Sequence, residues 1–244
     1  MNTAEPRPAT LVLGASRGIG RAICQRLLAS GHAVIGVARD FSASPLDHPA
    51  FTPVTLDLSR LDTLGKRFQD LQQAHPDITA LVCCAGRGQF GSLEEFSHEQ
   101  IRGLMELNFL SHACAARSFL PAMKRRRRGH LVFMGSEAAL AGRQKGAIYC
   151  ASKFALRGLA QALREECAGS GVHVSIVNPG MVKTGFFDGL DFAPGEQAHN
   201  YLLPEDVADA VQLILDAREG AVIEEINLSP LKKHVVFKKQ DARQ

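Results

Sequence analysis

A glycine-rich turn between an apolar run and a helical pattern restricts the fold of this chain more than any other feature. The apolar run is Thr10 to Leu13, the turn is Gly14-Ala15-Ser16-Arg17-Gly18-Ile19-Gly20, and a helical pattern follows up to about Gly31. Glycines let the backbone turn tightly and approach a pyrophosphate, and the N–H groups that open a helix attract its negative charge. The spacing differs from G-x-G-x-x-G, the general dinucleotide fingerprint. A glycine turn of an unrelated strand–turn–helix unit is the alternative interpretation.

Strand and helix patterns alternate along the rest of the chain. Further strands are expected at 33–38, 54–56, 79–84, 130–134, 172–177 and, as the last one, 221–228; helices are expected at 61–74, 98–124, 147–168 and from 204 onwards. The uninterrupted apolar run at 79–84 is typical of a parallel sheet that is covered on both faces. No repeat or change of composition divides the 244 residues. We therefore expect an α/β fold, a single Rossmann domain over 1–244 with a doubly wound parallel sheet flanked by helices.

Composition excludes several classes of protein. The chain is 45% hydrophobic and carries a net charge of +3, which is typical of an ordinary globular protein. No apolar run reaches the ~20 residues of a membrane helix, and the first ten residues contain no hydrophobic core of an export signal. The six cysteines form no C-x-x-C pair, and the nine histidines have no metal-binding spacing. We expect a cytoplasmic protein with free thiols and no metal, membrane or nucleic-acid partner.

Two segments of the chain are rich in basic residues. Five consecutive cations, Lys124 to Arg128, precede Gly129 at the end of the helix expected at 98–124. Positive charge is favourable at a helix C-terminus, and glycine commonly ends a helix. We interpret this run as a solvated helix end rather than as a nucleic-acid patch. The basic C-terminal tail, 231–244, has no assigned role.

Tyr149 and Lys153 lie four residues apart within the helix expected at 147–168. Positions i and i+4 share one face of a helix, and a nearby cation favours the phenolate over the phenol, whose free pKa is near ~10. Such a pair can act as a general acid/base, although a surface pair at this spacing also arises by chance. Ser136 follows a buried strand, where open α/β sheets bind ligands. Asn108 interrupts the helix expected at 98–124; an exposed position and a functional one both stay open.

The end of the second expected strand bears on the choice between NAD and NADP. In nucleotide-binding units of this type an acidic residue about 20 positions beyond the glycines holds the ribose hydroxyls, whereas an arginine accommodates a 2′-phosphate. Here Ala38 is followed by Arg39, Arg17 adds a positive charge in the glycine turn, and Asp40 is the one opposing feature. We therefore expect NADP(H). Asp57 is expected to meet the adenine, to cap the helix at 61–74, or both.

Taken together, these residues resemble the short-chain dehydrogenase/reductase family, in its NADP-preferring branch. The resemblance covers 10–230 and rests on the glycine turn, Asp57, Asn108, Ser136, Tyr149-x-x-x-Lys153 and Asn178-Pro179-Gly180, in this order and at family spacing. It implies an NADP(H)-dependent oxidoreductase that interconverts a carbonyl and an alcohol of a small molecule. Tyr149 would exchange the substrate proton, and Ser136 would hydrogen-bond the carbonyl. Lys153 would lower the tyrosine pKa and hold the nicotinamide ribose, while Asn108 would position Lys153 through a water.

The resemblance also implies contacts with the cofactor. They are Gly14, Ser16, Arg17, Gly18, Ile19, Gly20, Arg39, Asp57, Leu58, Ala85, Gly86, Asn108, Tyr149, Lys153, Pro179, Gly180, Val182 and Thr184. The loop 185–203 contains Phe186, Phe187, Leu190 and Phe192. These apolar residues are expected either to cover the substrate or to form ordinary packing. The helices at 98–124 and 147–168 resemble those with which the family assembles, so a homodimer or homotetramer is expected.

The chain departs from the family pattern in two places. Cys83-Cys84-Ala85-Gly86 stands where the family usually has Asn-Asn-Ala-Gly, which weakens a contact near the adenosine. The segment 225–230 lacks the glycine-rich ending of bacterial 3-oxoacyl-carrier-protein reductases and looks more like the branch that acts on hydroxy acids and small carbonyls. A 3-oxoacyl-carrier-protein reductase is therefore kept as an alternative. A non-enzymatic NADP-sensing or scaffold protein is the other alternative, which the intact Ser136, Tyr149 and Lys153 disfavour.

Overall fold

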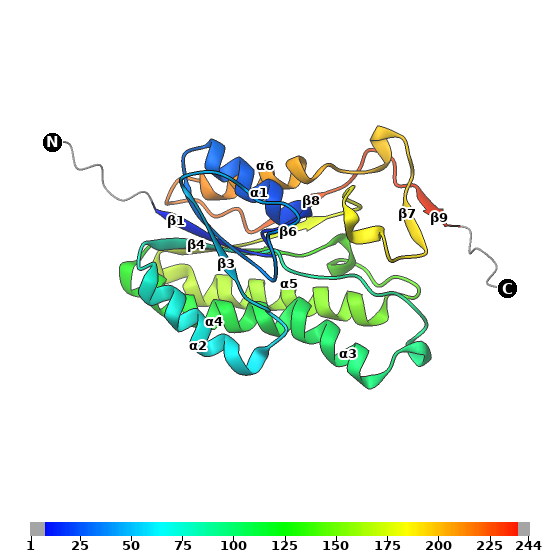
Figure 1. Ribbon diagram of the computed structural model, residues 1–244, viewed down its shortest axis with the longest axis horizontal. Coiled ribbons are helices and arrows are strands. Elements are labelled where there is room, and N and C mark those ends of the chain that lie inside the picture. The colour runs from blue at the N-terminus through cyan, green and yellow to red at the C-terminus, as the bar shows by residue number, and fades with distance from the viewer. Residues whose placement is uncertain (1–7, 239–244) are drawn as a thin grey trace.

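A seven-stranded parallel sheet runs through the computed structural model, which describes residues 8–238 (Figure 1). Its strands are β1 (Ala9–Leu13), β2 (Ala33–Ala38), β3 (Phe51–Thr55), β4 (Ile78–Cys83), β5 (Gly129–Met134), β6 (Val172–Pro179) and β8 (Glu225–Leu228). Their order across the sheet is β3-β2-β1-β4-β5-β6-β8, and every neighbouring pair is parallel. The strand order reverses between β1 and β4, where doubly wound sheets bind ligands. The expected Rossmann fold is confirmed.

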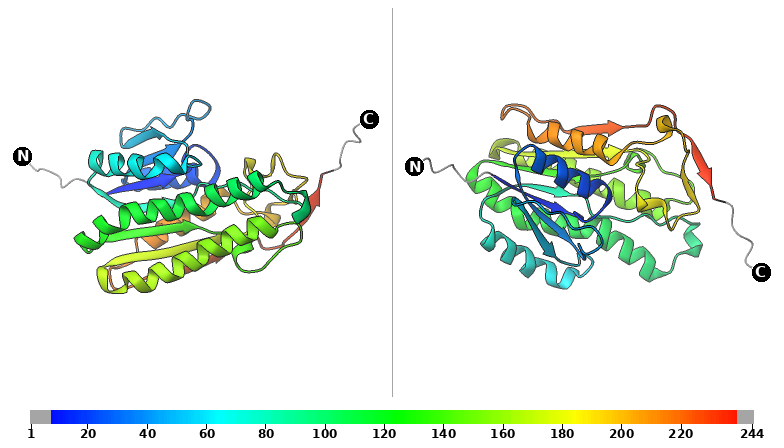
Figure 2. Two further views of the ribbon diagram at one scale, coloured as in Figure 1. Left: turned by 90° about the horizontal axis from the view of Figure 1, so that it is seen from below. Right: turned by 45° about the horizontal axis from the view of Figure 1, so that its top comes forward.

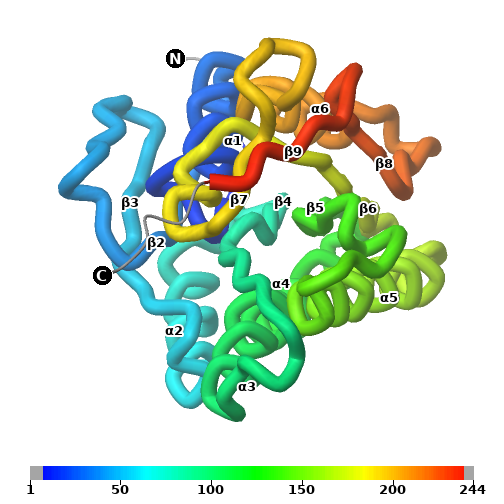
Figure 3. The backbone as a smooth tube through the Cα atoms, turned by 90° about the vertical axis from the view of Figure 1, so that its right-hand side faces the viewer, coloured from blue at the N-terminus to red at the C-terminus, as the bar shows by residue number. Residues whose placement is uncertain are grey.

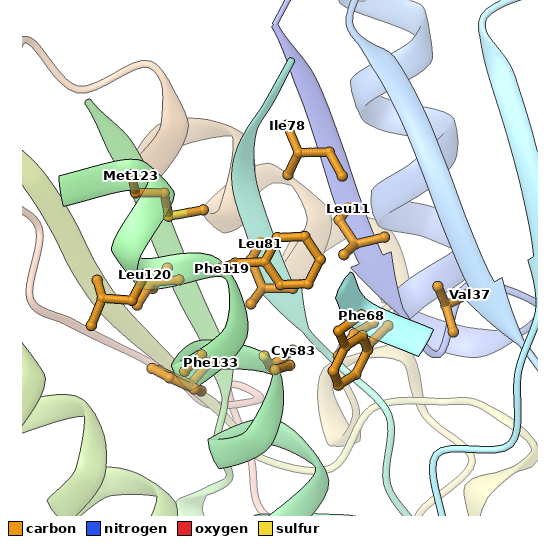
Figure 4. Close-up of a cluster of buried hydrophobic side chains, with 14 of the residues drawn as sticks. Leu11, Val37, Phe68, Ile78, Leu81, Cys83, Phe119, Leu120, Met123 and Phe133 are labelled. Atoms are coloured by element: carbon orange, nitrogen blue, oxygen red, sulfur yellow. The ribbon is translucent and has the colours of Figure 1, made fainter. Parts of the chain in front are cut away.

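Helices cover both faces of this sheet (Figures 1 and 2). On one face lie α1 (Gly18–Ala29) and α6 (Pro204–Leu215); on the other lie α2 (Leu61–Ala74), α4 (Ser111–Arg126) and α5 (Ala147–Cys167), with α3 (His98–Met105) beyond them. Successive strand residues point to opposite faces, so Leu11 packs against the α2, α4 and α5 side and Val12 against α1 and α6. In Figure 4, Phe68 and Phe119 meet edge to face beside Leu81, with ring centres 5.8 Å apart. Burial on both sides explains the continuous apolar strands.

The helix expected at 98–124 is interrupted by a π-helical turn, Glu106–Leu110, between α3 and α4. Asn108 lies in this turn and is completely buried. Its side-chain amide accepts a hydrogen bond from the N–H of Arg87 and donates one to the carbonyl of the same residue, both at 3.0 Å. The interpretation of Asn108 as an exposed helix position is therefore wrong. π-Helical turns often occur at functional sites, and this one turns Asn108 into the interior.

Asp57 does not cap α2. Its carboxylate accepts hydrogen bonds from the N–H and the hydroxyl of Ser59, at 3.0 and 2.8 Å. Arg60 occupies the N-cap position of the helix and makes no side-chain cap bond there. The capping role expected for Asp57 is therefore wrong, because the carboxylate closes the turn that precedes the helix instead.

The five cations from 124 to 128 do more than end a helix in solvent. Arg126 donates to the carbonyls of Pro76 and Ile78, the second at 2.6 Å. Arg127 has a left-handed backbone and donates to the carbonyl of Gly169 at 3.2 Å. These two side chains therefore tie the end of α4 to neighbouring segments. The purely solvated interpretation is corrected for them, because carbonyls at the ends of two other elements lie within reach.

The 185–203 loop and the C-terminal segment pair with each other, which the sequence reasoning did not predict. β7 (Phe192–Pro194) lies in the loop, β9 (Val235–Phe237) follows β8, and the two are antiparallel with Phe192 opposite Phe237. Figure 3 shows this ribbon over the carboxyl ends of the parallel strands. The strand expected at 221–228 begins only at Glu225 and is not the last one. A run of three apolar residues is too short to predict a strand from its pattern. Residues 239–244 of the basic tail lie outside the described part.

No helix within residues 8–238 is long and apolar enough to cross a bilayer. The same residues contain no group of three or more histidine, cysteine or acidic side chains that could hold a metal ion. All six cysteines lie in this range as free thiols. Burial raises the pKa of the Cys24 thiol to about 12, so that thiol stays protonated at neutral pH.

Candidate active site

The glycine-rich turn joins β1 to α1, and its backbone lies against the segment that follows β4. Gly14 has a φ of +87°, and a Cβ there would lie 2.8 Å from the Cα of Ala85. A Cβ on Gly20 would overlap the carbonyl oxygen of Gly14. Thr184, which follows β6 in the chain, also approaches the turn, with its Cγ2 at 3.4 Å from a Cβ built on Gly18. These approaches explain why glycine stands at positions 14 and 20.

The N-terminus of α1 offers free backbone N–H groups. Arg17 stands at the N-cap position, forms no side-chain cap bond within the described structure, and is followed by a first turn without an acidic residue. Such a helix start attracts a phosphate through its N–H groups and its dipole. The backbone cradle and the charge of Arg17 therefore fit the pyrophosphate of a dinucleotide.

Arg39 and Asp40 follow β2 and are both exposed. The Asp40 carboxylate accepts hydrogen bonds from the N–H and the hydroxyl of Ser42, both at 2.8 Å, and these bonds lower the pKa of Asp40. The pKa of Asp57 is also lowered, first by the hydrogen bonds from Ser59 and to a lesser extent by the charge of Arg39. The carboxylate of Asp40 is thus bonded within its own loop. The charge of Arg39 is near enough to Asp57 to affect the pKa of that carboxyl.

Other residues expected to touch a cofactor are placed mainly by packing. Leu58, Ala85, Pro179 and Val182 are buried, and Ser16, Ile19 and Gly180 are half-buried. The side chain of Leu58 belongs to the hydrophobic cluster under α2, so only its backbone can face a ligand. The N–H of Gly180 donates to the carbonyl of Leu228 at 2.8 Å, which fastens the turn after β6 to β8.

Tyr149 and Lys153 lie on one face of α5, near the carboxyl end of β5. The Nζ of Lys153 is 5.9 Å from the centre of the Tyr149 ring and donates to the carbonyl of Met134 at 2.9 Å. Ser136 follows the same strand, and its hydroxyl lies close enough to the Tyr149 side chain to lower the pKa of the phenol. Gly86 completes the group, because a Cβ there would lie 3.8 Å from the Nζ of Lys153. The structure therefore brings Ser136, Tyr149 and Lys153 together. The group lies next to the segment that follows β4, and the glycine-rich turn packs against the same segment.

Burial controls the protonation of this pair. It raises the pKa of Tyr149 to about 12, with the Ser136 hydroxyl acting in the opposite direction. It also lowers the pKa of Lys153 to about 8. The tyrosine pKa thus moves in the direction opposite to the expected one, because desolvation of the phenolate outweighs a cation that is engaged with the Met134 carbonyl. A phenol that stays neutral beside a hydroxyl is suited to donate a proton.

Ser152 links Asn108 to Tyr149, and sequence reasoning missed it. The Asn108 amide donates to the Ser152 hydroxyl at 3.3 Å, and that hydroxyl donates to the carbonyl of Tyr149 at 2.7 Å. Since the same amide is also bonded to the backbone of Arg87, Asn108 clamps the π-helical turn to α5. The position of Ser152 inside Tyr149-x-x-x-Lys153 was the signal that could have found it.

Asn178 holds Ser136 in place, a role that the sequence analysis did not assign to it. Asn178 is 1% exposed, and its Oδ1 accepts from the N–H of Ser136 at 3.3 Å. Its Nδ2 donates to Glu225 at 2.8 Å and to Asn227 at 3.0 Å. The segment 225–230, which departs from the family pattern, therefore supplies the groups that orient Asn178.

His112 is a buried imidazole close to the charge of Lys153. It is completely buried, and neither ring nitrogen has a hydrogen bond of ordinary geometry within the described residues. Burial, followed by repulsion from Lys153, lowers the pKa of His112 to about 3. The side chain is thus neutral in the folded protein at neutral pH.

We expect His112→Leu to make the folded protein less sensitive to acid. The His112 pKa is about 3 when folded and 6.5 as the ordinary value, so the unfolded chain binds the extra proton between these values. The wild type therefore loses stability as pH falls through this window, by roughly 2 kcal/mol at about pH 5. Urea unfolding at about pH 7 and pH 5 measures this loss. A change at the exposed His98 should leave the loss intact, and an undiminished loss in His112→Leu would contradict the assignment.

Comparisons with known proteins identify the family of the chain. Residues 8–191 match the family model for short chain dehydrogenases. The mouse 17-beta-hydroxysteroid dehydrogenase type 1 is 35% identical over 196 residues, which are 76% of this chain but only 57% of that protein. The 3-oxoacyl-acyl-carrier-protein reductase of Buchnera aphidicola is 29% identical, with 89% of this chain and 93% of the relative covered.

A solved structure extends the similarity over almost the whole chain. The alcohol dehydrogenase from Thermococcus sibiricus, complexed with 5-hydroxy-NADP, superposes with a TM-score of 0.83 at 26% identity. The superposition covers 93% of this chain and 99% of that one. The fold, the order of the site residues and the family model lead to the same conclusion. The chain belongs to the short-chain dehydrogenase/reductase family.

Proposed function

We propose that this protein is an NADP(H)-dependent oxidoreductase that interconverts a carbonyl and an alcohol, with Tyr149 as the general acid/base. The observation that carries the proposal is the convergence of Ser136, Tyr149 and Lys153 at the carboxyl edge of the sheet. These three groups lie beside a backbone cradle that fits a dinucleotide. A protein that only sensed NADP would need the cradle, but it would not need a phenol placed beside a serine hydroxyl and a buried lysine.

The chemistry of each side chain follows from its position. NADPH supplies the hydride when it is bound. The phenol of Tyr149 donates its proton to the carbonyl oxygen as negative charge develops there, and the hydroxyl of Ser136 donates a hydrogen bond to the same oxygen. The ammonium of Lys153 stabilises the phenolate that remains on Tyr149. The side-chain oxygen of Asn178 accepts from the backbone N–H of Ser136 and so keeps Ser136 in place. The side-chain amide of Asn178 is in turn held by Glu225.

The preference for NADP(H) rests on Arg39 and Arg17 as partners of the 2′-phosphate. The Asp40 carboxylate, which opposed this preference in the sequence, is occupied by Ser42. The superposed alcohol dehydrogenase, which was solved with 5-hydroxy-NADP, supports the same choice. We also propose a homodimer or homotetramer, because the half-exposed Leu110 and Phe154 leave apolar surface near α4 and on α5.

Arg39→Ala should weaken NADPH binding by roughly 10- to 100-fold and change NADH binding by less than about 2-fold. One charge-assisted hydrogen bond to a phosphate is worth about 1.5–3 kcal/mol, and NADH has no phosphate at this position. Fluorescence titration of the two cofactors measures both constants. Arg26→Ala serves as the matched control. It removes an exposed arginine of α1 that pairs with Asp209 of α6. Equal losses for NADPH and NADH in Arg39→Ala would show that the cofactor assignment is wrong.

The proposed reaction is tested by NADPH consumption with a panel of ketones, aldehydes and 3-oxoacyl thioesters, and by NADP⁺ reduction with the matching alcohols. Turnover of ketones that depends on Tyr149 supports the proposal. Turnover confined to the thioesters would favour the 3-oxoacyl reductase instead. NADPH binding without turnover of any member would favour the sensor or scaffold.

A further inference from the structure

Five aromatic rings form a closed circuit that includes the catalytic phenol. The ring of Tyr149 lies 5.1 Å from that of Phe90, which meets Phe192 edge to face at 5.0 Å. Phe192 lies 5.9 Å from Phe187, Phe187 lies 5.2 Å from Phe186, and Phe186 returns to Tyr149 at 6.0 Å. Four phenylalanines from two segments of the chain, the loop after β4 and the 185–203 loop, therefore form one cluster with Tyr149.

The aromatic circuit is almost entirely apolar. The Tyr149 hydroxyl is the single polar group that the five rings carry. Phe90 and Phe186 also pack on a buried apolar cluster that contains Leu104 and Ala138. A hydroxyl or carboxylate placed against these rings would lose its water without gaining a partner, which is unfavourable. A flat apolar ring would gain both from its burial and from edge-to-face contacts.

The circuit is held in place by the C-terminal segment 231–238. β9 pairs with β7, so that Phe192 stands opposite Phe237, and the N–H of Lys238 donates to the carbonyl of Asp191 at 2.7 Å. The Nζ of Lys238 donates to the carbonyl of Phe187 at 2.6 Å. One side chain of the C-terminal segment thus fixes the backbone that carries two rings of the circuit.

The same segment also reaches the residue that follows Ser136. The Nζ of Lys233 pairs with the carboxylate of Glu137 at 2.5 Å. The carbonyl of His234 accepts from the N–H of Gly195, just beyond β7. The C-terminal segment 231–238 therefore contacts both Glu137, next to Ser136, and the 185–203 loop that carries three of the phenylalanines. A two-stranded ribbon is only marginally stable by itself, so these contacts determine whether the circuit stays closed.

We propose that the substrate of Tyr149 carries its carbonyl on or beside an apolar ring, and that segment 231–238 determines this specificity by holding the aromatic circuit closed. The inference rests on the proposed function and names its substrate class. A C–H bond forms at the carbonyl carbon with the hydride of NADPH, which is oxidised to NADP⁺. The carbonyl oxygen takes the proton of the Tyr149 hydroxyl, and a ring-bearing alcohol leaves.

The first test compares two carbonyl compounds with NADPH. We expect kcat/KM for 1-tetralone, a ketone within a flat apolar bicycle, to exceed that for dihydroxyacetone by at least about 100-fold. Dihydroxyacetone is a small ketone whose two hydroxyls find no partners among phenylalanine rings. Equal values, or a preference for dihydroxyacetone, would overturn the proposal.

The second test removes one ring of the circuit. Phe192→Ala should lower kcat/KM for 1-tetralone by roughly 10- to 100-fold and leave that for dihydroxyacetone within about 3-fold. Leu231→Ala is the matched control, because Leu231 is an apolar residue of the same region that is 92% exposed. A loss of the same size for both ketones would assign Phe192 a purely structural role and overturn its part in specificity.

The third test addresses the C-terminal segment without truncating it. Lys238→Met removes the side-chain bond to the Phe187 carbonyl and keeps the β9 backbone, so we expect KM for 1-tetralone to rise about 5- to 10-fold while kcat for dihydroxyacetone and the Kd of NADPH stay unchanged. Lys232→Met alters a neighbouring exposed lysine and should match the wild type. An unchanged KM in Lys238→Met would contradict the role of the segment.

A binding measurement separates this inference from the proposed reaction. Calorimetry with 1-tetralone and NADP⁺ reports the ring site even in a protein that reduces nothing. Binding that weakens in Phe192→Ala, without turnover of any carbonyl, would overturn the proposed reaction and support the ring site. The absence of binding by 1-tetralone would overturn the ring site, whatever the protein does with other carbonyls.

Discussion

Replacing Tyr149 by phenylalanine should lower kcat for carbonyl reduction by roughly 10³-fold, within the usual contribution of a positioned general acid. The substitution removes only the hydroxyl. The ring contacts with Phe90 and Phe186 persist, so the aromatic circuit and the fold are expected to stay as they are. The NADPH Kd should change by less than about 2-fold. Steady-state kinetics and a fluorescence titration of NADPH separate the two effects.

The second tyrosine of the chain provides the control. Tyr201 accepts a hydrogen bond from the Nζ of Lys183 at 3.3 Å and lies outside the group of Ser136, Tyr149 and Lys153. Tyr201→Phe deletes the same atom from the same kind of side chain, and its kcat should remain near that of the wild type. Turnover that survives in Tyr149→Phe would remove Tyr149 from the role of proton donor.

The expected result for Lys153→Met is a protein that is more stable and nearly inactive. Burial lowers the Lys153 pKa from 10.5 to about 8, so the charged form at neutral pH costs roughly 3 kcal/mol of folding free energy. Loss of the hydrogen bond to the Met134 carbonyl offsets about 1 kcal/mol of this. We therefore expect a net gain of roughly 2 kcal/mol in the free energy of unfolding and a loss of about 10²–10³ in kcat.

The pH dependence identifies the cause of that gain. With a lower pKa in the folded protein, the unfolded chain binds the extra proton between about pH 8 and pH 10.5, so the wild type gains stability as pH rises through this window. The advantage of Lys153→Met should therefore be complete at about pH 7 and absent at about pH 10.5. Urea unfolding at both values measures it. The exposed Lys66, changed to methionine, should show no such advantage at either pH. A gain that persists at high pH would point to packing rather than charge.

Several site residues were predictable because their signals are local. Gly14, Gly18 and Gly20 stand in a turn between a strand and a helix, and their spacing is visible within seven residues. Tyr149 and Lys153 share a helix face by virtue of their spacing alone. Ser136 follows an apolar strand, whose carboxyl end must lie at the ligand edge of a parallel sheet. The roles proposed for these residues rest on the resemblance of that order to the family pattern.

Other features depend on residues that are far apart in the chain. The sign of the Tyr149 pKa shift comes from burial, and the rings that pack on Tyr149 belong to 90 and 186. Asn178 orients Ser136 only because Glu225 and Asn227 orient Asn178. Pairwise spacing within one segment carries no information about such contacts. The same holds for β9, a three-residue run that becomes a strand only by pairing with β7.

The sequence by itself therefore determined the Rossmann fold, the glycine turn and the positions of Tyr149 and Lys153, because periodicity and turn chemistry act over a few residues. The tertiary structure alone decided the environment of these groups: the neutral phenol, the buried clamp of Asn108, and the aromatic circuit held by the C-terminal segment. The physical reason is that desolvation and long-range hydrogen bonds depend on groups from distant segments, which only the folded chain brings together.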